Sequence, residues 1–399
     1  MRDSDESDKK QSTSLLGWLP RPKIKSNGLK RTITGLSLLA YFGAIIYGGL
    51  YVILLHGLTI QIVCYNEIIS VAYKVKKVQD IPYFRRLNWY FVMVANYFFF
   101  GETFAEHLEV YVKRYYAVHL LSSSHRFVSF CLYFAGIIWF LTRVRKKIMR
   151  QQFSLLAWMH FLLIIICLQS YMVVQNIFQG VIWLVVPLWM VVLNDVFAYV
   201  FGRFYGKTPL ISLSPKKTVE GFIGGGICTF VLGAFLSYVF CHFNCLVCPV
   251  RFVESENGIV VSTDCIPTYL YQPIEYNIGN TGLSVYLYPF ILHSLALAAF
   301  ASCIAPFGGF FASGFKRAFK IKDFSDLIPG HGGLMDRFDC QFLMATFVNV
   351  YISTFIKAPT VETIFKKILN LNDDNQLKFY HLLYESLQDR GMTDIMNNL

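Results

Sequence analysis

The carboxylates with the clearest chemical potential lie near residue 336, where an apolar segment begins. Asp336 and Asp339 are three positions apart, so on a helix they share one face. Carboxylates at a membrane boundary are costly unless they are paired or bound to a cation. Their hard oxygen atoms suit Mg²⁺, which is commonly bound by one or two carboxylates together with substrate phosphates. The spacing therefore predicts a cation site at the start of this helix.

Groups that attract anions surround these carboxylates. Gly330, Gly332 and Gly333 precede the expected helix, where glycine permits close backbone approach and free N–H groups favour an anion. Between them, His331 is a candidate acid, base or phosphate donor, or else a turn histidine with a structural hydrogen bond. The flanking cations are Lys316, Arg317, Lys322 and Arg337. This combination predicts a phosphate–metal site, whereas a basic cluster on lipid headgroups requires neither the glycines nor the spaced carboxylates.

A second carboxylate of interest ends another apolar segment. Asp195 lies near the boundary where that segment gives way to polar residues. An ionisable residue at such a place is a functional candidate by default. Pairing with Arg203 is the alternative interpretation.

The polar residues that follow resemble the entry to a further helix. Ser214 starts a turn, and its hydroxyl or that of Thr218 is placed to cap the next apolar segment. Lys216 and Lys217 are suited to hold a triphosphate, with Glu220 at the membrane edge. The alternative is a plain N-cap flanked by lysines whose stems lie along apolar surface.

The elements that must position these residues are membrane helices. The chain of 399 residues is 55% hydrophobic and only 15% charged, which is too apolar for one soluble core. Compared with the roughly 20 residues that a span needs, the sequence predicts an all-α polytopic membrane protein with about nine transmembrane helices. The expected spans are 34–55, 57–73, 89–104, 127–142, 154–174, 179–201, 219–241, 285–312 and 338–356.

The basic residues indicate the topology. Clusters of Lys and Arg follow the second, fourth, sixth and eighth spans, on the side of the N-terminus, which the positive-inside bias places in the cytosol. We expect a disordered basic tail over 1–32, a catalytic transmembrane domain over 33–356 and a C-terminal tail over 357–399. The net charge of +11 is spread over these short clusters, which argues against binding of nucleic acid.

The loop 242–284 is expected on the opposite, lumenal side. It contains Cys245, Cys248 and Cys265. An oxidising lumen permits disulfides. Free thiols are an alternative, and a zinc site through Cys245 and Cys248 is a weaker one.

The chain resembles the phosphatidate cytidylyltransferase family, specifically its eukaryotic branch. The resemblance covers roughly 30–356 and is strongest from residue 190 onward. Its main carrier is the C-terminal signature, which reads Ser313-x-x-Lys316-Arg317, four residues, Lys322-Asp323, then His331-Gly332-Gly333, two residues, Asp336-Arg337-x-Asp339. Asp195 with Ala198-Tyr199, and Ser214-Pro215-x-Lys217-Thr218-x-Glu220-Gly221, also resemble family elements.

The resemblance implies that phosphatidic acid and CTP react to give CDP-diacylglycerol and pyrophosphate, for phospholipid synthesis. It implies an enzyme of the endoplasmic reticulum membrane, with its site facing the cytosol, and a possible homodimer. The expected roles are metal binding by Asp323, Asp336 and Asp339; catalysis by Lys316, Arg317, Lys322, His331 and Arg337; and substrate binding by Asp195, Ser214, Lys216, Lys217, Thr218, Glu220, Ser313, Gly332 and Gly333.

One position departs from the family pattern. Bacterial members commonly have a Gly-Asp pair upstream of the signature serine, whereas this chain has Gly308-Gly309. Asp323, Asp195 or a substrate phosphate would have to take the place of that carboxylate. The rival functions are a CTP-dependent lipid kinase of the polyprenol or phytol type, which would release CDP, and a transporter, which would place ionisable residues near the middle of its spans.

Overall fold

The computed structural model describes residues 27–76, 82–107, 115–212, 214, 217–255, 258–262, 265–277, 284–328, 332–357, 364–365, 368–369 and 371–390. The predicted site residues Lys216 and His331 lie outside the described residues, as does most of the expected N-terminal tail. The chain forms two compact units, Met1–Asn349 and Val350–Leu399, and each is described by itself.

Helices account for most of the first unit, in agreement with the predicted fold class. The N-terminal half contains α1 (Asn27–Tyr47), α2 (Gly49–Lys76), α3 (Pro82–His107), α5 (Tyr116–Ser123), α6 (His125–Thr142), α7 (Met149–Leu162) and α8 (Gln169–Phe178), with a π-helical stretch, Leu163–Leu168, joining the last two. The C-terminal half contains α9 (Ile182–Phe204), α10 (Val219–Phe240), α11 (Asn244–Val247), α12 (Pro289–Cys303), α13 (Pro306–Ala318) and α14 (Met335–Tyr351).

Seven helical segments among the described residues are long and apolar enough to cross a membrane. They are Gly49–Tyr73, His125–Thr142, Lys146–Phe178, Ile182–Phe204, Val219–Phe240, Pro289–Ala318 and Met335–Ile356. Helices also form at the other two expected spans. The apolar part of α1 is short, Thr34–Tyr47, and α3 is not among the seven. A polytopic membrane protein is confirmed, whereas the count of nine is not.

Two helix breaks differ from the expected boundaries. The first expected span, 34–55, is interrupted because α1 ends at Tyr47 and α2 begins at Gly49, whose φ of +76° suits glycine at a helix end. The helix α1 also begins at Asn27, inside the expected tail. The eighth span is divided into α12 and α13 at Pro306, which cannot donate a hydrogen bond to a continuous helix.

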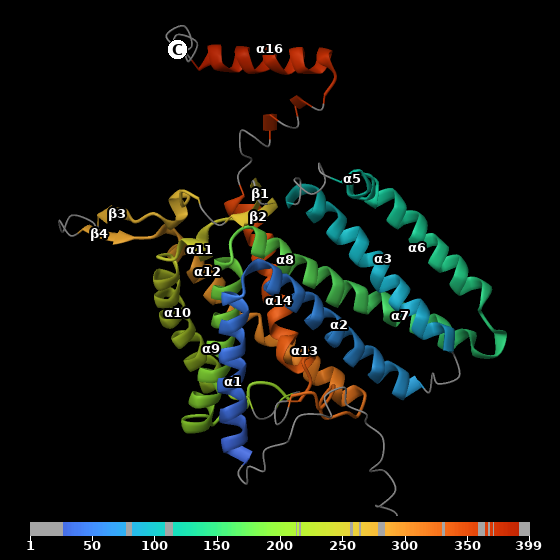
Figure 1. Ribbon diagram of the computed structural model, residues 1–399. Coiled ribbons are helices and arrows are strands. Elements are labelled where there is room, and N and C mark those ends of the chain that lie inside the picture. The colour runs from blue at the N-terminus through green and yellow to red at the C-terminus, as the bar shows by residue number, and fades with distance from the viewer. Residues whose placement is uncertain are drawn as a thin grey trace, which may run out of the picture. The chain divides into compact units, whose positions relative to one another are not determined.

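The helices α9, α10 and α12 pack side by side, and glycines allow α9 and α10 to approach closely (Figure 1). A Cβ at Gly221 would lie 2.6 Å from the carbonyl oxygen of Ala198, and one at Gly225 would lie 2.9 Å from the Ala198 nitrogen. A second group, α2, α3, α6 and α7, packs around a core that includes Phe84, Phe91 and Phe140, and α8 contacts α2 and α3. Residues of α13 and α14 join this core, which links the N-terminal helices to the signature.

The loop 242–284 is more ordered than expected. It contains two antiparallel hairpins, β1 (Arg251–Ser255) with β2 (Gly258–Ser262) and β3 (Ile274–Asn277) with β4 (Ser284–Leu287). Cys248 and Cys265 form a disulfide, so Cys248 is not available as a zinc ligand and the zinc alternative is wrong. Cys245 is exposed and not disulfide-bonded.

The second unit contains the end of α14, a π-helical turn, Ile352–Ile356, and the helix α16 (Asp373–Asp389). Asn372 caps α16, because its side chain accepts a hydrogen bond from the Asn375 N–H. No residue of α16 is buried. The expected tail therefore includes a regular helix.

Candidate active site

A short, poorly exposed ion pair joins the end of α13 to the start of α14. Lys316 Nζ donates to Asp336 Oδ1 at 2.5 Å, and the two side chains are only 18% and 2% exposed. Lys316 also lies over the ring of Phe324, 5.6 Å from its centroid. Screening by water is weak at such a pair, so the charges hold the two helix ends together.

The second oxygen of Asp336 accepts two backbone hydrogen bonds. The N–H groups of Phe324 and Gly333 each lie 3.0 Å from Oδ2. Gly332 has φ +83°, and a Cβ there would lie 3.2 Å from both Asp323 Oδ1 and Asp336 Oδ2. Here the glycine turn makes room for the protein's own carboxylates. The sequence predicted free N–H groups here that would bind an anion, but the N–H of Gly333 already donates to Asp336.

A carboxylate that the sequence interpretation left without a role caps the same helix. Glu67 of α2 accepts hydrogen bonds from the N–H groups of Leu334 at 2.9 Å and Met335 at 2.8 Å. It also accepts one from the Ser325 hydroxyl at 2.5 Å. The sequence feature that could have identified Glu67 was the presence of an ionisable residue inside a long apolar segment, which is unusual in a membrane helix.

The second predicted stretch meets the first at the same end of the helices. Lys217 Nζ lies 3.7 Å from Asp195 Oδ1 at the C-terminal part of α9. The same ammonium lies over the ring of Phe310 in α13, 5.1 Å from its centroid. Asp195 thus pairs with Lys217, and the predicted alternative partner Arg203 instead donates to the Tyr199 hydroxyl at 3.1 Å. Both members of the Asp195–Lys217 pair stay partly exposed, at 53% and 40% of their side chains.

Thr218 and Glu220 shape the turn between α9 and α10. Thr218 is the N-cap of α10, since its hydroxyl oxygen accepts from the Gly221 N–H at 3.2 Å. The Glu220 carboxylate accepts from the N–H groups of Lys207 and Thr208 and from the Thr208 hydroxyl, the last at 2.6 Å. These contacts hold the polypeptide that presents Lys217.

Asp339 links the two stretches. Its carboxylate interacts electrostatically with both Asp195 and Lys316, and its Oδ1 accepts from the Cys340 N–H at 2.8 Å. The unusual glycines of α13 lie against it: a Cβ at Gly308 would be 2.7 Å from the Asp339 carbonyl oxygen, and one at Gly309 would be 3.6 Å from Oδ2. Gly309 therefore lies next to Asp339, and the charge of Asp195 acts on the same carboxylate.

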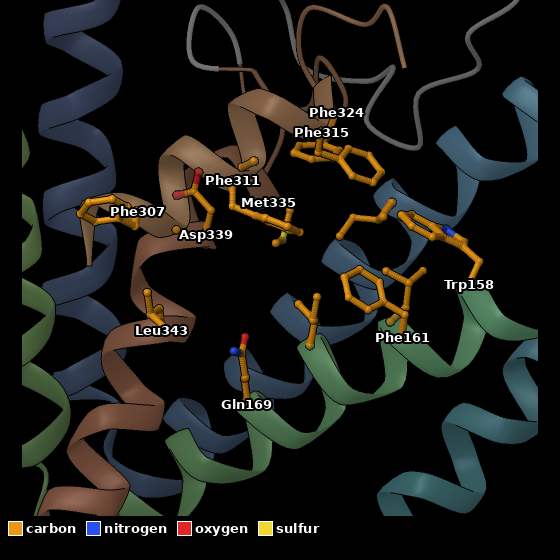
Figure 2. Close-up of a pocket in the computed structure, with 15 residues that line it drawn as sticks. Trp158, Phe161, Gln169, Phe307, Phe311, Phe315, Phe324, Met335, Asp339 and Leu343 are labelled. Atoms are coloured by element: carbon orange, nitrogen blue, oxygen red, sulfur yellow. The ribbon is translucent and has the colours of Figure 1, made fainter. Parts of the chain in front are cut away.

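An apolar pocket of about 280 Å³ opens beside Asp339 (Figure 2). Trp158 and Phe161 of α7 line one side, while Asp339 and Leu343 of α14 line another. Gln169 lies on α8 at a further part of the wall. Four phenylalanines complete the aromatic lining: Phe307, Phe311, Phe315 and Phe324. Asp339 thus belongs both to the charged cluster and to a wall suited to hydrocarbon.

The remaining predicted residues lie around this centre. Arg317, Lys322 and Arg337 are exposed, which leaves their charges available to a solute. Asp323, Ser214 and Ser313 are half-buried. Within the described ranges, no group of three or more Asp, Glu, His or Cys side chains is arranged to hold a metal ion. The proposed ligand set Asp323, Asp336 and Asp339 therefore stays a prediction.

Comparison with known proteins relates this geometry to a family. Residues 29–355 match the model of the cytidylyltransferase family. The chain is 49% identical over 368 residues to phosphatidate cytidylyltransferase 2 of Bos taurus, covering 91% of this chain and 82% of the relative. It is 48% identical to phosphatidate cytidylyltransferase 1 of Homo sapiens, covering 91% and 79%.

A more distant relative gives the same picture. Phosphatidate cytidylyltransferase of Caenorhabditis elegans is 44% identical over 389 residues, covering 95% of this chain and 82% of the relative. The matched region includes both polar stretches and all seven candidate membrane spans found among the described residues, apart from the final residue of the last. The chain belongs to the cytidylyltransferase family.

Proposed function

We propose that this protein transfers CMP from CTP to phosphatidic acid, giving CDP-diacylglycerol and pyrophosphate. The names of its relatives support this assignment. The observation that carries it is the position of Asp339, which borders both a charged cluster and an apolar pocket. A reaction between a soluble nucleotide and a lipid phosphate needs this juxtaposition, because one reactant is polar and the other has hydrocarbon tails.

The reaction joins two anions, so charge compensation is the main task of the protein. A phosphate oxygen of phosphatidic acid forms a bond to the α-phosphorus of CTP, and the bond from that phosphorus to the bridging oxygen breaks. Pyrophosphate leaves with the electron pair. Lys217 and Lys316 flank Asp339 and Asp195 and are placed to attract these phosphates. Positioning and electrostatic stabilisation then carry most of the rate.

The exposed cations form the outer part of the proposed phosphate site. Arg317, Lys322 and Arg337 would attract the triphosphate. In the same proposal, Lys216 contributes from the loop before α10. His331 orients a phosphate or the attacking oxygen.

We also propose Mg²⁺ as the cofactor. Asp195 and Asp339 fit a hard divalent cation, because the two carboxylates interact unfavourably and no Lys or Arg among the described residues forms an ion pair with Asp339. Asp336 can join them only if Lys316 leaves its Oδ1. When bound, the ion would neutralise phosphate charge and polarise the α-phosphate.

We propose that the site faces the cytosol from the endoplasmic reticulum membrane. The basic clusters support this orientation through the positive-inside bias. The disulfide supports it as well, since Cys248 follows the opposite end of α10 from Thr218 and disulfides persist in an oxidising lumen. A homodimer remains an expectation from the family.

The decisive experiment identifies both products. Purified protein in lipid vesicles would be incubated with phosphatidic acid, MgCl₂ and CTP carrying separate labels on its α- and γ-phosphates. The expected result is the α-label in CDP-diacylglycerol and the γ-label in pyrophosphate. Release of CDP with the γ-label on the lipid would instead identify a lipid kinase and overturn the proposal.

A further inference from the structure

Glu67 is a buried carboxylate in a membrane-crossing helix, and the proposed reaction does not use it directly. It lies on α2, in the segment Gly49–Tyr73, and is 7% exposed. Among the described residues, no Lys or Arg forms an ion pair with it. A carboxylate in this environment is costly unless strong donors compensate for the loss of water.

The compensating donors all belong to the signature segment. Oε1 accepts from the Ser325 hydroxyl and the Leu334 N–H, and Oε2 accepts from the Met335 N–H. The first N–H groups of a helix lack intrahelical partners and form the positive end of its dipole. Glu67 therefore occupies the place that an external anion takes at other helix starts, and it does so from an element more than 250 residues earlier in the chain.

The contact is closely packed. A Cβ at Gly333 would lie 2.8 Å from Glu67 Oε2 and 2.9 Å from the Ser325 nitrogen, so the turn has no room to shift toward α2. Gly333 also donates to Asp336, whose own carboxylate holds Lys316. Glu67, which lies on α2, and Asp336, which lies on α14 itself, thus both accept hydrogen bonds from the turn at the start of α14.

This turn sets the position of Asp339. Asp339 is one helical turn beyond Met335, whose N–H is bound by Glu67. A shift of the turn would therefore move Asp339 relative to Asp195 on α9.

We propose that Glu67 is a positioning residue of this enzyme: by binding Ser325, Leu334 and Met335, it fixes the first turn of α14 so that Asp339 faces the reacting phosphates. The inference rests on the proposed function. Its three hydrogen bonds are already formed within the protein, so its effect on the reaction passes through α14. Small displacements of positioned groups cost roughly 100-fold in rate.

The test compares Glu67→Gln with two further variants of the full-length protein. Gln keeps the shape, but its amide NH₂ would face one of the donors. Ser325→Ala removes one donor and leaves the carboxylate in place. Gln61→Leu is the matched control, because Gln61 is buried on α2 and bonds to Asn96 of α3. For each variant, kcat and the KM for CTP would be measured, together with hydrogen exchange of 324–340.

For Glu67→Gln, we expect kcat to fall at least tenfold with a KM for CTP within about threefold of the wild-type value. Exchange in 324–340 should accelerate, because the Leu334 and Met335 N–H groups lose an acceptor. Ser325→Ala should shift both quantities less, in the same direction. Gln61→Leu should leave exchange in this segment unchanged.

Three results would overturn the inference: an unchanged kcat despite faster exchange, unchanged exchange, or an equal fall of kcat in Gln61→Leu. If Glu67→Gln does not fold, Ser325→Ala decides by the same criteria. Absence of pyrophosphate from the wild-type reaction would count against the proposed function, whereas the exchange data would still test the contact itself.

Discussion

Asp339 lies between two different environments. One side carries the charges of Asp195 and Lys316, and the other contributes to an apolar pocket. Asp336, three residues earlier, is instead enclosed by Lys316 and two backbone N–H groups. The two signature carboxylates, which look equivalent in the sequence, therefore have different roles in the structure.

Asp339→Asn should lower kcat by about 100-fold, because a neutral amide cannot attract a divalent cation as a carboxylate does. The measurement is CDP-diacylglycerol formation over a range of MgCl₂ concentrations. Asp389→Asn is the matched control, since Asp389 is exposed on α16 and lies outside the unit that contains the site. A kcat within twofold of wild type for Asp339→Asn would refute its assignment.

Asp336→Asn should affect stability as well as turnover. The change leaves Lys316 without its anionic partner in a poorly exposed place, which costs several kcal/mol when a buried pair is broken. Thermal unfolding in detergent should shift downward together with the loss of activity. The double variant Lys316→Met/Asp336→Asn removes the unpaired ammonium and keeps a side-chain oxygen that can accept from the Phe324 and Gly333 N–H groups, so it should recover much of the unfolding temperature but not the activity. Normal turnover of Asp336→Asn would contradict a role in the site.

At the scale of elements, the α9–α10 turn shows how a helix cap serves the site. Thr218→Ala removes the hydroxyl that caps α10 and should cost about 1 kcal/mol of stability. Thr59→Ala is a suitable control, because among the described residues the Thr59 hydroxyl bonds only to the carbonyl of Leu55 in its own helix. Thermal unfolding of the two variants would be compared. An equal effect of both would show that the cap contributes nothing specific.

The contact between α13 and α14 depends on a glycine at position 308. Gly308→Ala would place a methyl group 2.7 Å from the Asp339 carbonyl oxygen, so the helices must separate. Overpacking of this kind costs about 1–3 kcal/mol, and we expect a loss of activity because Asp339 moves. In Gly226→Ala the nearest atom would be the Ser302 Cβ at 3.6 Å, an ordinary contact. Comparable activity of the two variants would refute the close-contact argument.

The sequence predicted the presence of the helices more accurately than the residues at which they begin and end. Long apolar runs predicted a helix for each expected span, but the break at Gly48–Gly49 required the backbone conformation of Gly49. The hairpins near Cys248 were not expected, because short strands in a polar loop carry a weak pattern. The role of Glu67 was missed because its partners lie far away in the chain, and one sequence does not reveal such contacts.

At the scale of the whole molecule, the N-terminal helices do more than hold the protein in the bilayer. α7 contributes Trp158 and Phe161 to the pocket beside Asp339, and α2 contributes Ile68. The proposed lipid side of the site is therefore built jointly by both halves of the chain. The signature motif and the Asp195–Lys217 pair carry the charges, whereas helices of both halves supply the hydrocarbon surface.

Filling this pocket should change the preference among lipid substrates. Leu343→Trp adds bulk at the wall opposite Trp158 and should raise the KM for long-chain phosphatidic acid several-fold, with little effect on a short-chain analogue. Leu292→Trp introduces the same residue at an exposed position of α12 as a control. Initial rates against both lipids in mixed micelles would measure the effect. Identical changes for the two chain lengths would contradict an acyl-binding role.

The Lys316–Asp336 pair has one further consequence. Any phosphate that recruits the Lys316 ammonium must compete with a carboxylate that is permanently attached to the same protein. This competition from Asp336 lowers the affinity of Lys316 for a lone phosphate or for the pyrophosphate product. A ligand that arrives with its own divalent cation can instead offer Asp336 a replacement partner. The Lys316–Asp336 pair would then favour the binding of nucleotide–metal complexes and speed the release of pyrophosphate.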